Sequence, residues 1–87
     1  MTPNISHFFG ITISMYHDDH NPPHFHASYQ NNEVKILIKN FSLLEGKIPP
    51  KAFALTIEWA MQHQEELIQN WENMVQDKEL AKIKPLE

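Results

Sequence analysis

The chain has 87 residues, no cysteine and a formal net charge of −4, and all seven of its cationic side chains are lysines. This length corresponds to one domain with a modest core, and the missing cysteines exclude a disulfide framework and thiolate zinc ligands. The first residues lack the pattern of a signal peptide, and no apolar run reaches the length of a membrane span. We therefore expect a cytoplasmic protein without membrane contact.

Three stretches alternate between apolar and polar residues, which predicts β-strands at about residues 8–16, 24–30 and 33–39. A two-residue turn at Asn31 and Asn32 would join the last two strands, because asparagine tolerates positive φ angles. That turn would place Ala27 opposite Ile36, and the preceding strand would place Ile13 opposite Ala27. All three strands then share one apolar face.

From about residue 50 to residue 76 the apolar period changes to 3.6, which predicts one long helix after Pro49 and Pro50. Gln64 interrupts the apolar stripe, so we expect its amide to hydrogen-bond a strand end or the stripe to bend there. Residues 78–87 would form an extended tail. The predicted fold class is α+β, in which residues 1–87 form a single domain with a three-stranded antiparallel meander packed on one long C-terminal α-helix.

The predicted helix is longer than the sheet that it covers. It would span about 40 Å, whereas a seven-residue strand spans about 23 Å. Its far end must therefore pack on the tail, on residues 41–44, or on another chain. If another chain covers it, the expected interface residues are Trp59, His63, Trp71, Met74 and Val75.

The most concentrated chemistry lies between His17 and His26, where four of the six histidines fall within ten residues. Histidine is the commonest metal ligand, and His24 and His26 lie two apart on one predicted strand face. We expect no cofactor unless this stretch holds a divalent metal. Such a site would draw its ligands from His17, Asp18, Asp19, His20, His24 and His26.

Two other interpretations of the same face stay open. The first is a metal-independent ribonuclease, in which two imidazoles and an ammonium supply the base, the acid and phosphate stabilisation. Its candidate catalytic residues are Tyr16, His24, His26, Lys35 and Lys39. The second is that the histidines support a proline corner and the open sheet face contacts a protein. Nucleic acid is disfavoured as a partner, because the chain has no arginine and residues 52–77 carry only acidic charges.

Several motifs together are characteristic. They comprise Asp19-His20-Asn21-Pro22-Pro23-His24-Phe25-His26-Ala27, residues 44–49, residues 58–60 with His63, and residues 66–71 and 83–86. In these motifs the chain resembles an uncharacterised bacterial family, the domain of unknown function DUF4160. Members are similar to components of two-gene operons of toxin–antitoxin type. The resemblance implies a protein-interaction component of such a module, which would bind a small operon-neighbour protein or a second copy of itself. It supplies no catalytic residues.

Overall fold

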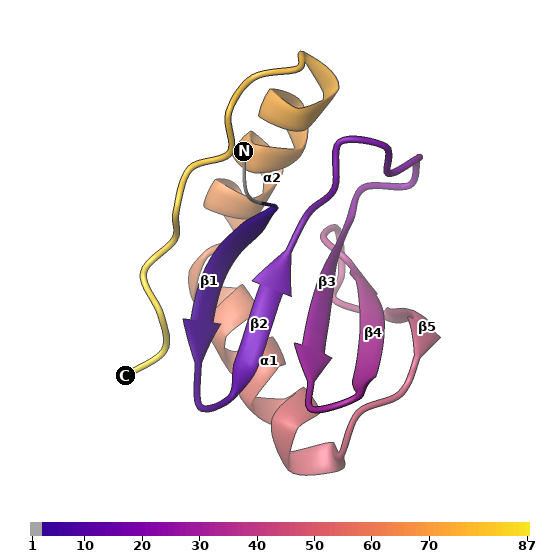
Figure 1. The fold of residues 1–87 in the computed structure, drawn as a ribbon, viewed down its shortest axis with the longest axis vertical. Helices are drawn as coiled ribbons and strands as arrows, with labels where there is room; N and C mark the ends of the chain where they lie inside the picture. Colours follow the sequence, from indigo (N-terminus) through magenta and orange to yellow (C-terminus); the bar gives the residue numbers. More distant parts are fainter. Residues whose placement is uncertain (1–2) are drawn as a thin grey trace.

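The computed structural model describes residues 3–87, which form one antiparallel sheet of five strands and two helices (Figure 1). The strands are β1 (Asn4–Phe8), β2 (Ile11–Ser14), β3 (His24–Tyr29), β4 (Asn32–Leu37) and β5 (Leu43–Gly46), and they lie in the sheet in chain order. Helices α1 (Pro50–Gln62) and α2 (Gln64–Val75) lie behind the sheet. The predicted α+β class with an antiparallel meander is confirmed, but the numbers of strands and helices were wrong. Neither helix in this part of the chain combines the length and the apolar character needed to cross a membrane.

The single strand predicted at residues 8–16 was wrong: residues 4–14 form the hairpin of β1 and β2, and residues 15 and 16 lie beyond β2. Phe9 and Gly10 form the turn of this hairpin with φ angles of 48° and 80°, and Phe8 pairs with Ile11 across it. Two successive positive φ angles are typical of the tight turns that favour Asn-Gly. The turn was not predicted, because the first of these positions carries phenylalanine, which is not typical of such turns. The side chain of Phe9 is 60% exposed and does not belong to the core.

The turn between β3 and β4 lies at Gln30 and Asn31, one residue earlier than predicted. Ala27 therefore pairs with Val34 and not with Ile36. The predicted register was wrong by two residues, which leaves every side chain on its predicted face because strand side chains alternate with period two. The predicted pairing of Ile13 with Ala27 is confirmed.

β5 was not predicted, because its four residues do not alternate and all are exposed. It forms an edge of the sheet next to β4. Gly46 is required where this strand ends: it has a φ angle of 90°, and a Cβ there would lie 2.1 Å from the carbonyl oxygen of Glu33.

The single helix predicted at residues 50–76 was also wrong, because the chain breaks at His63, which has a φ angle of −132°. Directly after the break, Nε2 of Gln64 donates hydrogen bonds to the carbonyl oxygens of Ile38 (2.8 Å) and Lys39 (3.1 Å). The predicted hydrogen bond from Gln64 to a strand end is thus confirmed. This anchor ties the start of α2 to the chain just beyond β4.

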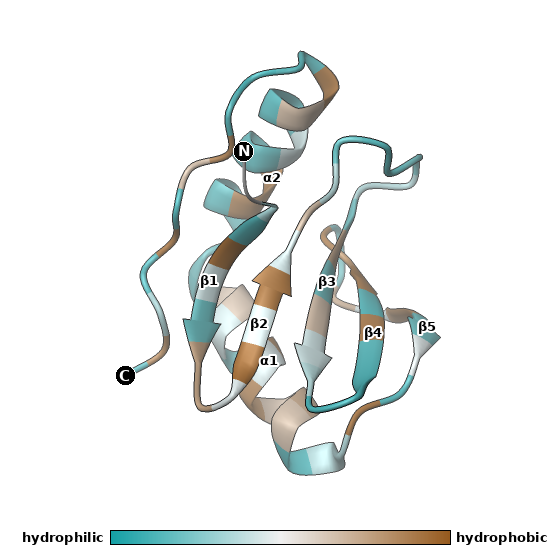
Figure 2. Ribbon diagram, viewed as in Figure 1, coloured by the Kyte–Doolittle hydropathy of each residue, from teal (hydrophilic) through white to brown (hydrophobic). Residues whose placement is uncertain are grey.

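The core lies between the sheet and the helices. Ile13, Ala27 and Ile36, which the predicted strands share on their apolar face, have no exposed surface, and neither has Leu67 of the apolar stripe predicted for the helix. Figure 2 shows hydrophobic residues alternating with hydrophilic ones along the strands, as expected for a sheet with one buried face. The two layers are therefore held together mainly by apolar burial.

The tail is fixed to the domain by hydrogen bonds from two directions. Asn70 on α2 exchanges two hydrogen bonds with the backbone of Ala81, at 2.9 and 2.8 Å. The indole of Trp59 donates to the carbonyl oxygen of Lys84 at 2.9 Å, and the amide of Ile83 donates to Ile5 on β1 at 2.8 Å. Leu80 and Ile83 belong to the same buried cluster as Trp71 and Met74. The tail of the same chain therefore helps to cover the end of the helical layer.

Replacing Ile36 by alanine should lower the free energy of unfolding by about 2–4 kcal/mol, because it removes buried methyl groups and leaves a cavity. Chemical denaturation followed by circular dichroism measures this change. Lys39→Ala, at an exposed position, is the control and should change stability by less than about 0.5 kcal/mol. Equal stability of the two variants would contradict the assigned core.

Replacing Asn70 by alanine should cost about 1–3 kcal/mol, since it removes both hydrogen bonds that hold Ala81. The amide of Ile83 should then exchange with deuterium faster than in the unmodified chain. Asn73→Ala removes a more exposed amide from the same helix and provides the control. Unchanged exchange at Ile83 would show that the tail is held without Asn70.

Candidate functional site

Residues 15–23, here called the covering loop, connect β2 to β3 and carry one side chain back toward the sheet. The loop closes on itself at Tyr16 and Asp19. The amide of Asp19 donates to the carbonyl of Tyr16 at 3.0 Å, and the carboxylate of Asp19 accepts from the amide of Tyr16 at 2.9 Å. The peptide bond between Asn21 and Pro22 is cis, the chain bends at these two residues, and Pro23 leads directly into β3.

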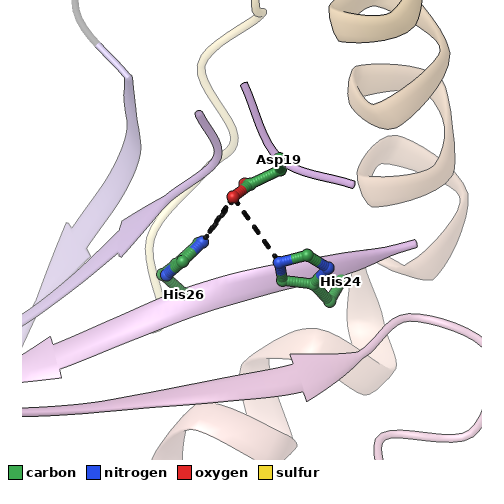
Figure 3. A group of neighbouring side chains, drawn as sticks. All are labelled: Asp19, His24 and His26. Atoms are coloured by element: carbon green, nitrogen blue, oxygen red, sulfur yellow. Dashed lines mark hydrogen bonds and ion pairs between the residues drawn. The ribbon is translucent and has the colours of Figure 1, made fainter. Parts of the chain in front are cut away.

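Asp19, His24 and His26 meet where β3 begins, and together they are called the Asp–His–His cluster (Figure 3). Nε2 of His26 lies 3.1 Å from each oxygen of the Asp19 carboxylate, and Nε2 of His24 lies 3.6 Å from one of them. Figure 3 shows the carboxylate facing both rings, which project from the same face of β3. Two histidines two apart on one strand and one loop aspartate therefore converge on a single point.

The cluster is largely buried, which differs from the open sheet face that we expected. His24 and His26 are each 5% exposed. The ring of Tyr16 packs edge-on against His26 at 4.7 Å between centroids, and Trp71 of α2 lies 5.4 Å from His24. The face is therefore closed at this end by the covering loop and by α2.

The remaining ring nitrogens have different surroundings. Nδ1 of His24 donates a hydrogen bond to the carbonyl oxygen of Pro22 at 2.8 Å. In a neutral ring Nε2 then carries no hydrogen, and its lone pair faces Asp19. Nδ1 of His26 is buried and has no hydrogen-bond partner within residues 3–87. The carboxylate of Glu33 lies 3.6 Å from it. In metal sites, a carbonyl or a carboxylate in this position orients a ligand histidine.

The spacing of the cluster can be compared with a metal coordination shell. Ligands at about 2.0–2.1 Å from a tetrahedral ion lie about 3.3 Å from one another. In the cluster, the carboxylate of Asp19 lies 3.1 Å from Nε2 of His26 and 3.6 Å from Nε2 of His24. The three ligand atoms all lie within 4.8 Å of one another. The two separations from Asp19 are therefore close to those between ligands that surround one ion.

Asp19 and His24 also form part of the wall of an open depression of about 490 Å³. The other residues that line it are Asp18, His20, Asn21, Pro22, Lys35, Leu44 and Glu45. This depression gives solvent and small ions a route to two members of the buried cluster.

The structure places the other predicted metal ligands outside the cluster. Asp18 and His20 are exposed on the covering loop. His17 is exposed as well, and its Nε2 contacts the carbonyl oxygen of Lys78 at 3.1 Å. Three of the six predicted ligands thus come together, and three do not.

The residues predicted for acid–base catalysis separate in a similar way. Tyr16, His24 and His26 are neighbours, and Lys35 lies opposite His26 on β4 and close to Glu45, at 3.8 Å. Lys39 is exposed beyond the end of β4. Glu33 was missed, because the predicted register did not place it close to His26.

The five residues predicted as an interface lie mainly inside the domain. Trp59, Trp71 and Met74 are 0%, 7% and 4% exposed. His63 is half-buried, and it contacts Glu66 through Nδ1 at 2.6 Å. Val75, at 66% exposed, is the one with a largely free side chain.

Comparison with known proteins identifies a family. A family model described as a domain of unknown function, DUF4160, matches residues 10–72, a span that contains the whole Asp–His–His cluster. Comparison with curated proteins and comparison with solved structures each gave no match. Because the family model covers most of the 87 residues, the chain belongs to the DUF4160 family.

Proposed function

We propose that the Asp–His–His cluster binds one divalent transition-metal ion, for which zinc is the best match. Nε2 of His24, Nε2 of His26 and the carboxylate of Asp19 would be the ligands. The observation that carries the proposal is the convergence of these three ligand atoms, within 4.8 Å of one another, at a largely buried point. Imidazole and carboxylate are suitable ligands for zinc, and three protein ligands leave a further coordination position open.

The direction of the donors supports a cation. Because Nδ1 of His24 donates to Pro22, Nε2 of the neutral ring is an acceptor, and it faces a second acceptor on Asp19 at 3.6 Å. Either a proton on Nε2 or a metal ion between the two groups resolves this opposition. A metal ion would also replace the proton that His26 shares with Asp19, and Nδ1–H of His26 would then point toward Glu33.

A metal-independent ribonuclease receives less support from the geometry. Both histidines are 5% exposed, so a nucleic acid cannot reach their rings without movement of the covering loop. Lys39, one of the five predicted catalytic residues, is exposed beyond the end of β4. The metal proposal uses the same histidines and does not require them to be exposed to a large substrate.

The metal proposal predicts one equivalent of zinc bound by protein that was purified without a polyhistidine tag and treated with a chelator. Isothermal titration calorimetry should give a Kd of about 1 μM or lower, and zinc should raise the Tm. Each of the changes Asp19→Ala, His24→Ala and His26→Ala should weaken binding by at least about 100-fold, because each removes a ligand. Glu33→Gln should weaken it by about tenfold.

His7→Ala is the matched control, since His7 is an exposed strand histidine that contacts Thr12. His17→Ala and His20→Ala test whether the exposed loop histidines collect zinc nonspecifically. The proposal is wrong if the unmodified chain binds no zinc, or if the double variant His24→Ala, His26→Ala binds as much zinc as the unmodified chain does.

We also propose that the protein acts in the bacterial cytoplasm as the interaction component of a toxin–antitoxin-like pair. The motif resemblance supports this role, and one structural observation favours it: β5 is an edge strand with two exposed leucines, Leu43 at 53% and Leu44 at 43%. A partner strand can add to such an edge through backbone hydrogen bonds.

If the operon neighbour pairs with β5, Leu43→Lys should abolish its co-purification, because a charge at an edge blocks strand addition. Ile68→Lys, at an exposed apolar position on α2, is the control and should leave the pair intact. Equal recovery of the neighbour with both variants would exclude β5 as the contact.

A further inference from the structure

A second cavity is lined by residues from the turn of the β1–β2 hairpin and from the start of α1. Figure 1 shows that these two segments lie at the end of the sheet away from the covering loop. The cavity is called the hairpin-end cavity here, and its volume is about 440 Å³. The residues that line it are Phe9, Ile11, Tyr29, Pro49, Lys51, Ala52 and Leu55. This volume lies in the range of small-molecule sites, which is roughly 300–1,000 Å³.

The walls of this cavity are mostly apolar. Ile11 and Ala52 are buried and line its inner side, and the half-buried Leu55 also lines it. The half-buried Tyr29 adds an aromatic ring to the wall. An apolar ligand of small size would therefore find a preformed surface on two sides, from the sheet and from the helix.

Phe9 is the least expected member of the wall. It is 60% exposed and has a φ angle of 48°, which is unfavourable for a bulky side chain. Asparagine suits this turn position better. The ring of Phe9 packs edge-on against the buried Phe8, at 6.4 Å between centroids, and most of its surface stays exposed. Backbone strain of this kind concentrates at functional sites. A ligand that packs against the ring accounts for both the strain and the exposure.

The charge of the cavity is positive. Lys51 is the one charged residue among those that line it. Lys51 also lies in the first turn of α1, which in the described chain has no side-chain cap and no acidic residue. The free N–H groups of a helix start add a positive partial charge to that of the ammonium group. The polar part of a fitting ligand should therefore be an anion.

We propose that the hairpin-end cavity binds a small carboxylic acid with an aromatic or branched aliphatic body. The body would pack between Phe9 and Leu55, and the carboxylate would pair with Lys51. This site is separate from the Asp–His–His cluster, with which it shares no lining residue. The proposal therefore holds or fails independently of metal binding.

The test uses 3-phenylpropionate as the probe and the neutral 3-phenylpropan-1-ol as its matched analogue, titrated into ¹⁵N-labelled full-length protein at low salt. The acid should bind saturably with a Kd of about 1 mM, as expected for a fragment of this size. Its shifts should centre on the amides of Phe9, Tyr29 and Ala52. The alcohol should bind roughly fivefold more weakly, because it cannot pair with Lys51.

Three variants test the assigned contacts. Lys51→Met should reduce the affinity for the acid to that for the alcohol, whereas Lys39→Met, at an exposed lysine outside the cavity, should not. Phe9→Asn should raise the Tm and weaken both ligands. Leu55→Trp should fill the cavity and abolish binding, and the lysine pair remains decisive if that variant does not fold.

The outcomes separate clearly. Saturable binding that prefers the acid and depends on Lys51 supports the proposal. Shifts that stay linear to about 20 mM, far above the Kd expected of a fragment, would overturn it. Equal affinity for acid and alcohol, or equal effects of Lys51→Met and Lys39→Met, would also overturn it, because the recognition of a carboxylate would then be absent.

Discussion

The carboxylate of Asp19 is the group on which the arrangement of this end of the molecule depends. It accepts a hydrogen bond from the amide of Tyr16 at 2.9 Å, which closes the covering loop. It also contacts Nε2 of His26 at 3.1 Å, which fixes the loop to β3. The loop in turn buries two histidines that would otherwise stand on an open sheet face. Trp71 packs on His24 from α2 and lies in the core cluster with Leu80. The candidate site is therefore connected through one side chain to the helices and the tail.

Much of the fold follows from the sequence because a buried face imposes a period. Period two predicted β3 and β4 and assigned Ile13, Ala27 and Ile36 to the core, and period 3.6 predicted the helical region with Leu67. The failures have local causes. The β1–β2 turn carries phenylalanine where turn chemistry favours asparagine, and the break at His63 contains neither glycine nor proline. In the second case the interruption of the apolar stripe at Gln64 indicated the place, and the expected hydrogen bonds from Gln64 anchor α2 to the chain beyond β4. That one helix would end and a second begin there was not predicted, because the apolar period of 3.6 continues past the break.

The candidate site was predictable in composition but not in geometry. The density of histidines and aspartates between residues 17 and 26 identified the right stretch, and the spacing of His24 and His26 placed both on one face. Which aspartate would join them depends on the path of the covering loop, because Asp18 and Asp19 are equivalent as ligands in the sequence. The contribution of Glu33 depends on strand register, where a two-residue error moves it away from His26. Burial of the pair arises from residues far apart in the chain, such as Trp71.

The proposed metal site requires that two imidazoles and one carboxylate, and no other histidine, surround the ion. X-ray absorption at the zinc edge, measured on protein loaded with one equivalent, examines this ligand set. A site formed by Asp19, His24 and His26 should give a first shell of nitrogen and oxygen atoms at about 2.0 Å, with the outer-shell scattering of two imidazole rings. A shell without imidazole scattering would contradict this ligand set. A shell with three or four rings would also contradict it, because that result would require His17 or His20 to bind the ion.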